Sequence, residues 1–328
     1  MDSPARRNAW TVDPTTDLIC ITLGWMVFFW VPYFFAEYAE TLRFIAVSTF
    51  VGHRYITFPL VYLDRAEFNR RPGVYILTPI LAFAFVGLCY YFQVDEPEMF
   101  TLWYLFTFFH IVRQKYGILR IYSGRAGWGH KRLDAWAIYA WGLAGFFYMF
   151  CYQADEGRVM HYLRTLLGVA PPTLLVDGLY AAAALLTGAW LVYELRSPGR
   201  ISLPKLLFFG SVAFMLGACP ILSADATAIA SAFSHAAEYF ALVGVMVKNK
   251  ARTRPLDVPL LSRVAPHVVL HIFLFILYIN LLFLGIKALS VMAFQVLAYG
   301  ASFMHYIYDG MIWRVRRPRV AQEVGVAA

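Results

Sequence analysis

The stretch that decides the fold is APHVVLHIFLFILYINLLFLG, residues 265–285. It contains no Asp, Glu, Lys or Arg, and a helix needs about 20 such residues to cross the hydrocarbon core of a bilayer. Apolar runs of similar length recur along the chain, which is 60% hydrophobic and 15% charged over 328 residues. Because backbone groups in lipid must be satisfied internally, we predict an all-α, polytopic integral membrane helix bundle.

About ten transmembrane helices fit the pattern of apolar runs. Their expected ranges are 17–36, 42–63, 73–93, 98–120, 134–153, 173–194, 204–222, 224–247, 265–285 and 289–313. The connections are short, so residues 1–328 are expected to form a single transmembrane domain. The longest outer connection, 157–172, is expected to include an interfacial helix.

Basic residues gather in every second connection. They are Arg6, Arg7, Arg65, Arg70, Arg71, Arg120, Arg125, Lys131, Arg132, Arg196, Arg200, Lys205, Lys248, Lys250, Arg252, Arg254, Arg263, Arg314, Arg316, Arg317 and Arg319. The other connections hold Arg43, Arg158, Arg164 and Lys287, with the acidic Asp95, Glu96, Glu98, Asp155 and Glu156. The positive-inside rule then predicts that both termini lie in the cytoplasm. The expected location of this multi-pass protein is the cytoplasmic (inner) membrane. Because the net charge of +8 is spread over these loops, we expect no nucleic-acid partner.

Four histidines lie at nearly the same predicted membrane depth on four different spans: His53, His110, His235 and His305. They are about eight to twelve residues from the cytoplasmic ends, roughly 12–18 Å deep. Ionisable groups inside a bilayer cost about 2.5–3.5 kcal/mol each on insertion scales, so several at one depth indicate a functional site. We therefore expect a buried metal centre.

Three of these histidines have a second polar group one helical turn away on the same face. The pairs are His110 with Gln114, His235 with Glu238, and His305 with Asp309. Helix-bundle di-iron sites use Glu and His at this spacing, and imidazole with carboxylate suits iron, manganese or zinc. The carboxylates are expected either to bind the metal or to orient the imidazoles that do.

The candidate site residues follow from these spacings. The expected metal ligands are His53, His110, His235, His305, Glu238, Asp309 and His271; the expected catalytic residues are Glu238, Asp309 and Tyr306; Arg113 and Gln114 are expected to bind a cofactor or an anionic group. The ammonium group of Lys115 is expected to extend to the cytoplasmic headgroups, and Asp64 with Arg65 is expected to be an interfacial charge.

The histidine-rich design resembles the integral-membrane non-haem iron oxidoreductases, the class of fatty-acid desaturases and hydroxylases. The box-like match is His267-Val-Val-Leu-His271, and the HxxHH boxes of that class are absent. The resemblance implies iron as the cofactor and a lipid as the substrate.

We therefore expect a membrane metal-dependent oxidoreductase of lipid metabolism, with mono- or dinuclear non-haem iron or another transition metal. Its substrate would be a hydrophobic or lipid-like molecule entering from the membrane lipids, for hydroxylation, desaturation or oxidative cleavage. A cytoplasmic electron donor would dock on the basic loops. The alternatives are a haem- or quinone-linked electron carrier with paired axial histidines, a proton-coupled transporter with a His/carboxylate relay, and an assembly factor without chemistry.

Overall fold

A computed structural model of the chain describes residues 9–153, 158–168, 172–197 and 202–326. Of the described residues 86% are helical and none is in a strand, which confirms the all-α class. Five charged residues used above for orientation lie outside the described residues: Arg6, Arg7, Asp155, Glu156 and Arg200.

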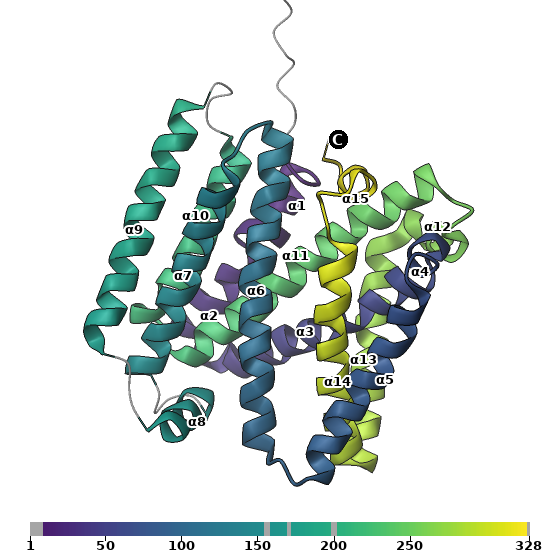
Figure 1. Ribbon diagram of the computed structural model, residues 1–328, viewed down its shortest axis with the longest axis horizontal. Helices are drawn as coiled ribbons and strands as arrows, with labels where there is room; N and C mark the ends of the chain where they lie inside the picture. Colours follow the sequence, from purple (N-terminus) through teal and green to yellow (C-terminus); the bar gives the residue numbers. More distant parts are fainter. Residues whose placement is uncertain (1–8, 154–157, 169–171, 198–201, 327–328) are drawn as a thin grey trace, which may run out of the picture. The chain divides into compact units, whose positions relative to one another are not determined.

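Fifteen α-helices follow one another along the described chain (Figure 1). Their bounds are α1 Pro14–Thr16, α2 Val27–Phe34, α3 Ala39–Tyr62, α4 Arg65–Phe68, α5 Pro72–Tyr91, α6 Glu96–Ala126, α7 Lys131–Tyr152, α8 Arg158–Leu167, α9 Thr173–Arg196, α10 Leu203–Gly217, α11 Ala224–Thr253, α12 Pro259–Val264, α13 Val268–Leu289, α14 Val291–Ile312 and α15 Pro318–Glu323. A π-helix covers Asp17–Thr22, and short 3₁₀ turns cover Gly24–Met26, Ala36–Tyr38, Cys219–Ile221 and Ala265–His267.

Among the described residues six helical segments are long and apolar enough to cross a membrane, and the chain is therefore a multi-pass membrane protein. They are Ala36–Tyr62, Pro72–Tyr91, Lys131–Tyr152, Thr173–Arg196, Ala226–Thr253 and Pro259–Leu289. A seventh span results if Pro14–Thr22 and Gly24–Phe34, which meet at 46°, are counted together. The other predicted spans fall on α6, α10 and α14, and α8 lies in the connection where an interfacial helix was expected.

Local sequence explains where several helices begin. The hydroxyl of Ser290 accepts from the backbone N–H of Ala293 at 3.2 Å and caps α14, and the ring of His130 accepts from Leu133 at 3.1 Å and caps α7. The bend near the N-terminus depends on Gly24, because a Cβ there would lie 1.8 Å from the carbonyl oxygen of Ile19. Only glycine fits this junction between the π-helix and the following turn.

The chain divides into two compact units. The first contains the described residues of Met1–Arg43 and Phe108–His235, and the second contains those of Phe44–Thr107 and Ala236–Val326. Helices α3, α6 and α11 continue from one unit into the other. The expectation of a single transmembrane domain stays a prediction.

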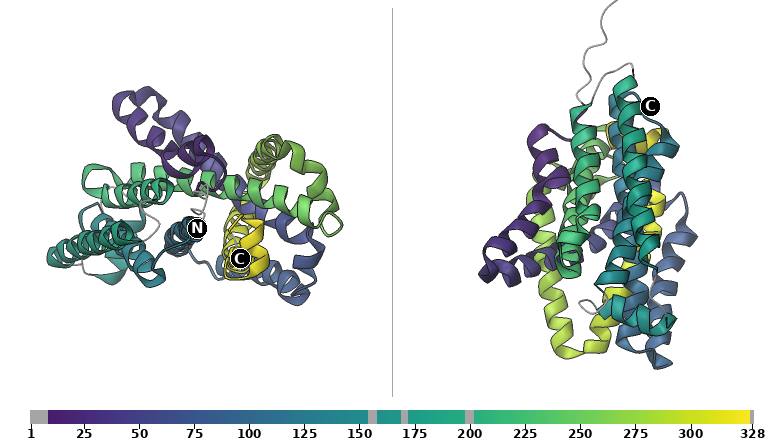
Figure 2. Two further views of the ribbon diagram at one scale, coloured as in Figure 1. Left: turned by 90° about the horizontal axis from the view of Figure 1, so that it is seen from above. Right: turned by 90° about the vertical axis from the view of Figure 1, so that its left-hand side faces the viewer.

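In the first unit α7 packs along α9 and against α10 (Figures 1 and 2). Buried carboxylates join these helices. Asp134 on α7 accepts from the indole of Trp190 at 2.8 Å and pairs with Arg120. Glu194 on α9 pairs with the fully buried Lys205 of α10. These two buried carboxylates are thus each paired with a cation.

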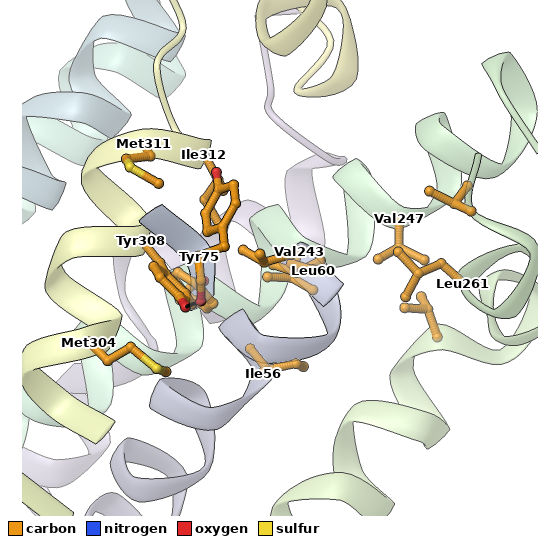
Figure 3. Packing of buried hydrophobic residues seen from close by; sticks show 14 of the residues in the cluster. Ile56, Leu60, Tyr75, Val243, Val247, Leu261, Met304, Tyr308, Met311 and Ile312 are labelled. Carbon is orange, nitrogen blue, oxygen red and sulfur yellow. Dashed lines mark hydrogen bonds between the residues drawn. The ribbon is translucent and has the colours of Figure 1, made fainter. Parts of the chain in front are cut away.

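In the second unit α5 packs along α14, and α13 packs beside α14 (Figure 1). The contact between α5 and α14 is close at Gly300, where a Cβ would lie 2.3 Å from the ring of Phe83. Figure 3 shows the apolar cluster of this unit, in which Tyr75 and Tyr308 lie together beneath Met311 and Ile312. The hydroxyl of Tyr308 donates to the carbonyl oxygen of Tyr75 at 2.6 Å, so its polar end is satisfied within the core.

A buried ionic network also belongs to the second unit, and it corrects the expectation for Asp64. Its side chain is fully buried and pairs with Lys250 at 2.8 Å and with Arg254 at 2.7 Å, instead of lying at the interface beside Arg65. Arg254 also donates to Glu323 of α15 at 3.0 Å. The expectation missed these partners because they stand 186 and 190 residues later in the chain; Asp64 also caps α4 by accepting from the backbone N–H of Glu67.

Candidate metal site

Two of the predicted ligands, His53 on α3 and His305 on α14, meet inside the second unit. Their ring centroids are 4.8 Å apart and the rings are nearly perpendicular. One ring nitrogen of each lies within 4.8 Å of the other, and the side chains are only 1% and 0% exposed. Two imidazoles are therefore brought together in a dry interior.

The neighbouring groups determine which nitrogen of His53 can bind a metal. Its Nδ1 is hydrogen-bonded to the carbonyl oxygen of Phe50, one turn earlier on α3. A carbonyl oxygen only accepts, so Nδ1 carries the hydrogen and the lone pair of the neutral ring lies on Nε2. Hydrogen bonds of this kind commonly hold metal-binding histidines in one tautomer and orientation.

A chain of hydrogen bonds also reaches Nδ1 of His305. Tyr239 donates its hydroxyl hydrogen to Oδ1 of Asp309 at 3.0 Å, and its oxygen lies 2.8 Å from Oγ1 of Thr57. Thr57 in turn lies 2.7 Å from Nδ1 of His305. With Asp309 ionised, one order that satisfies these groups runs from His305 to Thr57 to Tyr239 to Asp309. Nδ1 of His305 then carries a hydrogen, and Nε2 carries the lone pair.

Nε2 of His305 lies 3.4 Å from Oδ2 of Asp309. In that tautomer a lone pair faces a carboxylate oxygen, and a cation between the two atoms would bind both. The cation is either a proton or a metal ion. Ligand atoms bound to one ion at about 2.1 Å lie roughly 3.0–3.4 Å apart, so the observed distance suits a shared metal.

A second pair of predicted ligands, His110 on α6 and His235 on α11, lies inside the first unit. Their ring centroids are 5.0 Å apart at 81°, and both rings are buried. Gln114, one turn from His110, donates to the carbonyl oxygen of His235 at 2.9 Å. Gln114 therefore holds α6 against α11 beside this pair, and Arg113 next to it is exposed.

Lys115 corrects a further expectation. It is 0% exposed and donates to the hydroxyl of Ser234 at 2.7 Å, so it does not extend to the headgroups. Its position on α6 directs the ammonium group toward α11 within the first unit, where packing outweighs its tendency to reach water.

The remaining predicted residues lie as follows. Glu238 is fully buried on α11, directly before Tyr239. The hydroxyl of Tyr306 bonds to Thr107 instead of the carboxylate of Asp309. His271 is partly exposed, and its Nδ1 donates to the carbonyl oxygen of His267 at 2.9 Å. Within the described part of the chain, His271 is not brought to the pair on α3 and α14.

Two residues of the site were not chosen from the sequence as site residues. Thr57 stands four residues after His53, so it has the same spacing as the His/polar pairs that were recognised. Tyr239 follows Glu238 directly and stands four residues after His235, so it too has this spacing. The common centre expected from all four histidines stays a prediction, because the two pairs belong to different units.

Comparison of the chain with family models, curated proteins and solved structures finds no match.

Proposed function

We propose that this protein is an integral-membrane, metal-dependent oxidoreductase that acts on a hydrophobic, lipid-like substrate. The observation that supports this most directly is the buried His53–His305 pair with a carboxylate oxygen of Asp309 at 3.4 Å from His305. Non-haem iron is the first choice for the metal, because two imidazoles and a carboxylate are the donor set of many non-haem Fe(II) oxygenases.

The metal, when bound, would supply O2-dependent hydroxylation, desaturation or oxidative cleavage. Thr57 and Tyr239 hold the imidazole of His305 and the carboxylate of Asp309 in place through their hydrogen bonds. The apolar helices around the pair exclude water from the reacting groups. The His110–His235 pair of the first unit is a second candidate pair of ligands, and its variants are tested separately below.

The topology that accompanies this function has ten spans with both termini in the cytoplasm of a cytoplasmic (inner) membrane. It is supported by the coincidence of every predicted span with a helix and by the alternation of basic loops. Hydrophobic substrate would enter from the lipid, and a redox protein would deliver electrons from the basic side. Single cysteines at positions 316 and 98, in a chain whose own cysteines are replaced, test the orientation. A membrane-impermeant maleimide added outside intact cells should label position 98 and not position 316.

Metal analysis of the purified protein tests the proposal. Wild type, His53→Ala, His305→Ala and Asp309→Asn are compared by elemental analysis and optical spectroscopy, with the partly exposed His271→Ala as the matched control. One or two irons per chain in wild type and the control, with loss in the other three variants, is the expected result. His110→Ala and His235→Ala report on the second pair in the same assay.

A wild-type protein that remains without metal after anaerobic reconstitution with ferrous iron overturns the proposal. A Soret band in the wild-type spectrum would replace it with a haem-binding electron carrier.

A proton-coupled transporter is the second candidate, because His305, Thr57, Tyr239 and Asp309 form a continuous hydrogen-bonded chain through which a proton can pass. In liposomes it would acidify or alkalinise the lumen in response to an imposed substrate gradient, and Tyr239→Phe would abolish this. An oxidoreductase has no such activity.

A further inference from the structure

Arg54 is a cation buried inside a predicted membrane span, next to His53 on α3. Only 6% of its surface is exposed. Its Nη1 donates to the hydroxyl of Ser302 on α14 at 2.8 Å. Its guanidinium carbon lies 4.4 Å above the ring of Phe50 and 5.1 Å above that of Trp103. The head of this side chain is therefore fixed in place on three sides, all within the second unit.

The charge of Arg54 has no partner of opposite sign in the part of the chain that the structure describes. Its hydrogen bonds there go to Ser302 and, at 3.5 Å, to the carbonyl oxygen of Ala298, both from Nη1. Nε is buried and has no hydrogen-bond partner there. A buried charge without a counter-ion is costly in general, and the aromatic faces of Phe50 and Trp103 offset only part of that cost.

Nε, and Nη2 on the same edge of the guanidinium, thus have no acceptor among the described residues. Two parallel donors at this spacing match the two oxygens of a carboxylate or a phosphate. Ser302, which holds the opposite edge, stands three residues before His305 on α14, a rise of about 4.5 Å. An oxyanion bound by Arg54 would therefore lie within roughly one or two helical turns of the histidine pair.

We propose that Arg54 binds the oxyanion head group of an amphiphilic ligand, either the carboxylate of a long-chain acid or a long-chain phosphate monoester. This inference rests on the proposed function in so far as that ligand is the substrate. It defines the substrate class as acidic lipids and excludes neutral hydrocarbons. It also places the head group of the substrate, and not the middle of its chain, beside Arg54.

Equilibrium binding of radiolabelled palmitate to the full-length protein in nanodiscs of neutral lipid tests this site. Hexadecyl phosphate and hexadecanol serve as competitors of equal chain length. Wild type should bind palmitate or hexadecyl phosphate at least about tenfold more tightly than hexadecanol, which corresponds to about 1.4 kcal/mol. The better of the two acidic ligands identifies the oxyanion as carboxylate or phosphate.

Variants then assign the preference to Arg54. In Arg54→Gln the affinity for the acidic ligand should fall to that for hexadecanol, and Arg54→Lys should keep part of the preference. The matched control is Arg43→Gln on the same helix, whose side chain is 46% exposed and pairs with Glu40 at 3.6 Å. It should behave as wild type.

Equal affinities for acid and alcohol in wild type overturn the inference, and this comparison needs no variant to fold. An undiminished preference in Arg54→Gln also overturns it. Metal content, measured in the same samples, separates the two proposals: an acid preference in a protein that binds no metal overturns the oxidoreductase and retains the Arg54 site. Bound metal without a preference for the acidic ligand overturns the Arg54 site and retains the oxidoreductase.

Discussion

Tyr239 donates its hydroxyl hydrogen to Oδ1 of Asp309 across 3.0 Å, joining α11 to α14 in the interior of the second unit. The same hydroxyl lies 2.8 Å from Thr57, so one phenol contacts the carboxylate and the residue that orients His305. Asp309 and His305 thereby depend on side chains from two other helices for their orientation. The predictions below separate these contributions.

Thr57→Val removes the hydroxyl that holds Nδ1 of His305 and keeps the shape of the side chain. We expect metal affinity to fall about 10–100-fold, because groups that orient a metal-binding imidazole contribute to affinity by that amount. Competition with a chelator of known affinity measures the change. Thr57→Ser retains the hydroxyl and should remain within a few-fold of wild type; equal loss in both variants would contradict the role given to this hydroxyl.

Tyr239→Phe leaves Asp309 with one hydrogen bond fewer in a buried site. We expect the free energy of unfolding to drop by about 1–3 kcal/mol, the usual cost of an unsatisfied buried polar group, together with weaker metal binding. Chemical denaturation in mixed micelles and the chelator assay measure the two effects. Tyr306→Phe is the comparison, since its hydroxyl bonds to Thr107, and it should leave metal affinity unchanged. A larger loss of metal affinity in Tyr306→Phe than in Tyr239→Phe would favour Tyr306 as the catalytic tyrosine.

Asp64→Asn leaves Lys250 and Arg254 buried with less negative charge around them. We expect a loss of about 3 kcal/mol in unfolding free energy, as is typical when one member of a buried ion pair is removed. Asp257→Asn is the control, because this carboxylate is 45% exposed and lies 3.6 Å from Arg254. Exposed pairs contribute about 0–1 kcal/mol, so the control should differ little from wild type.

The same network predicts how stability depends on pH. Burial alone would raise the pKa of Asp64, but the hydrogen bonds and charges of Arg254 and Lys250 outweigh burial and hold this pKa well below its ordinary value of 3.8. A carboxylate with a lowered pKa in the folded state stabilises fully above its ordinary pKa, and this stabilisation is lost as pH falls below that value. Thermal unfolding between pH 5 and pH 3 should show a falling midpoint in wild type and a flatter profile in Asp64→Asn. Parallel profiles would show that other carboxylates dominate.

Gly300→Ala introduces a Cβ 2.3 Å from the ring of Phe83 between α5 and α14. We expect destabilisation by about 1–3 kcal/mol, the usual cost of overpacking. Gly87→Ala on α5 is the matched control, because no heavy atom of the described chain lies within 4 Å of its added Cβ. This change should be neutral or stabilising by up to about 1 kcal/mol, since alanine favours the helix. The denaturant midpoint of Gly300→Ala should fall below that of wild type, and the midpoint of Gly87→Ala should stay equal to it or rise above it.

Features that depend on neighbouring turns of one helix could be predicted from the sequence. The predicted apolar runs are helical, and six helical segments of the described residues are long and apolar enough to span a membrane, as is expected where lipid offers the backbone no other partner. The approach of His305 to Asp309 was expected from their four-residue spacing and is confirmed at 3.4 Å.

Features that depend on packing between helices could not be predicted. Thr57 and His305 are 248 residues apart in the chain, so no local pattern indicates that they touch. Lys115 and Asp64 were expected at the membrane surface because lysine and aspartate usually lie there, yet both are buried beside partners from distant segments. Those partners, Ser234 and Lys250, are ordinary residues in the sequence and become significant only when α6, α11 and the end of α3 are packed.

The ionic network also sets an order of events during synthesis. Asp64 leaves the ribosome 186 residues before Lys250 and 190 residues before Arg254, its partners in the finished protein. During that interval its carboxylate lacks the two cations that pair with it in the finished protein. The final burial of Asp64 therefore waits for α11, and Glu323 on α15 completes the charge balance later still. Translation past this last helix is thus the step that allows the second unit to close over its charges.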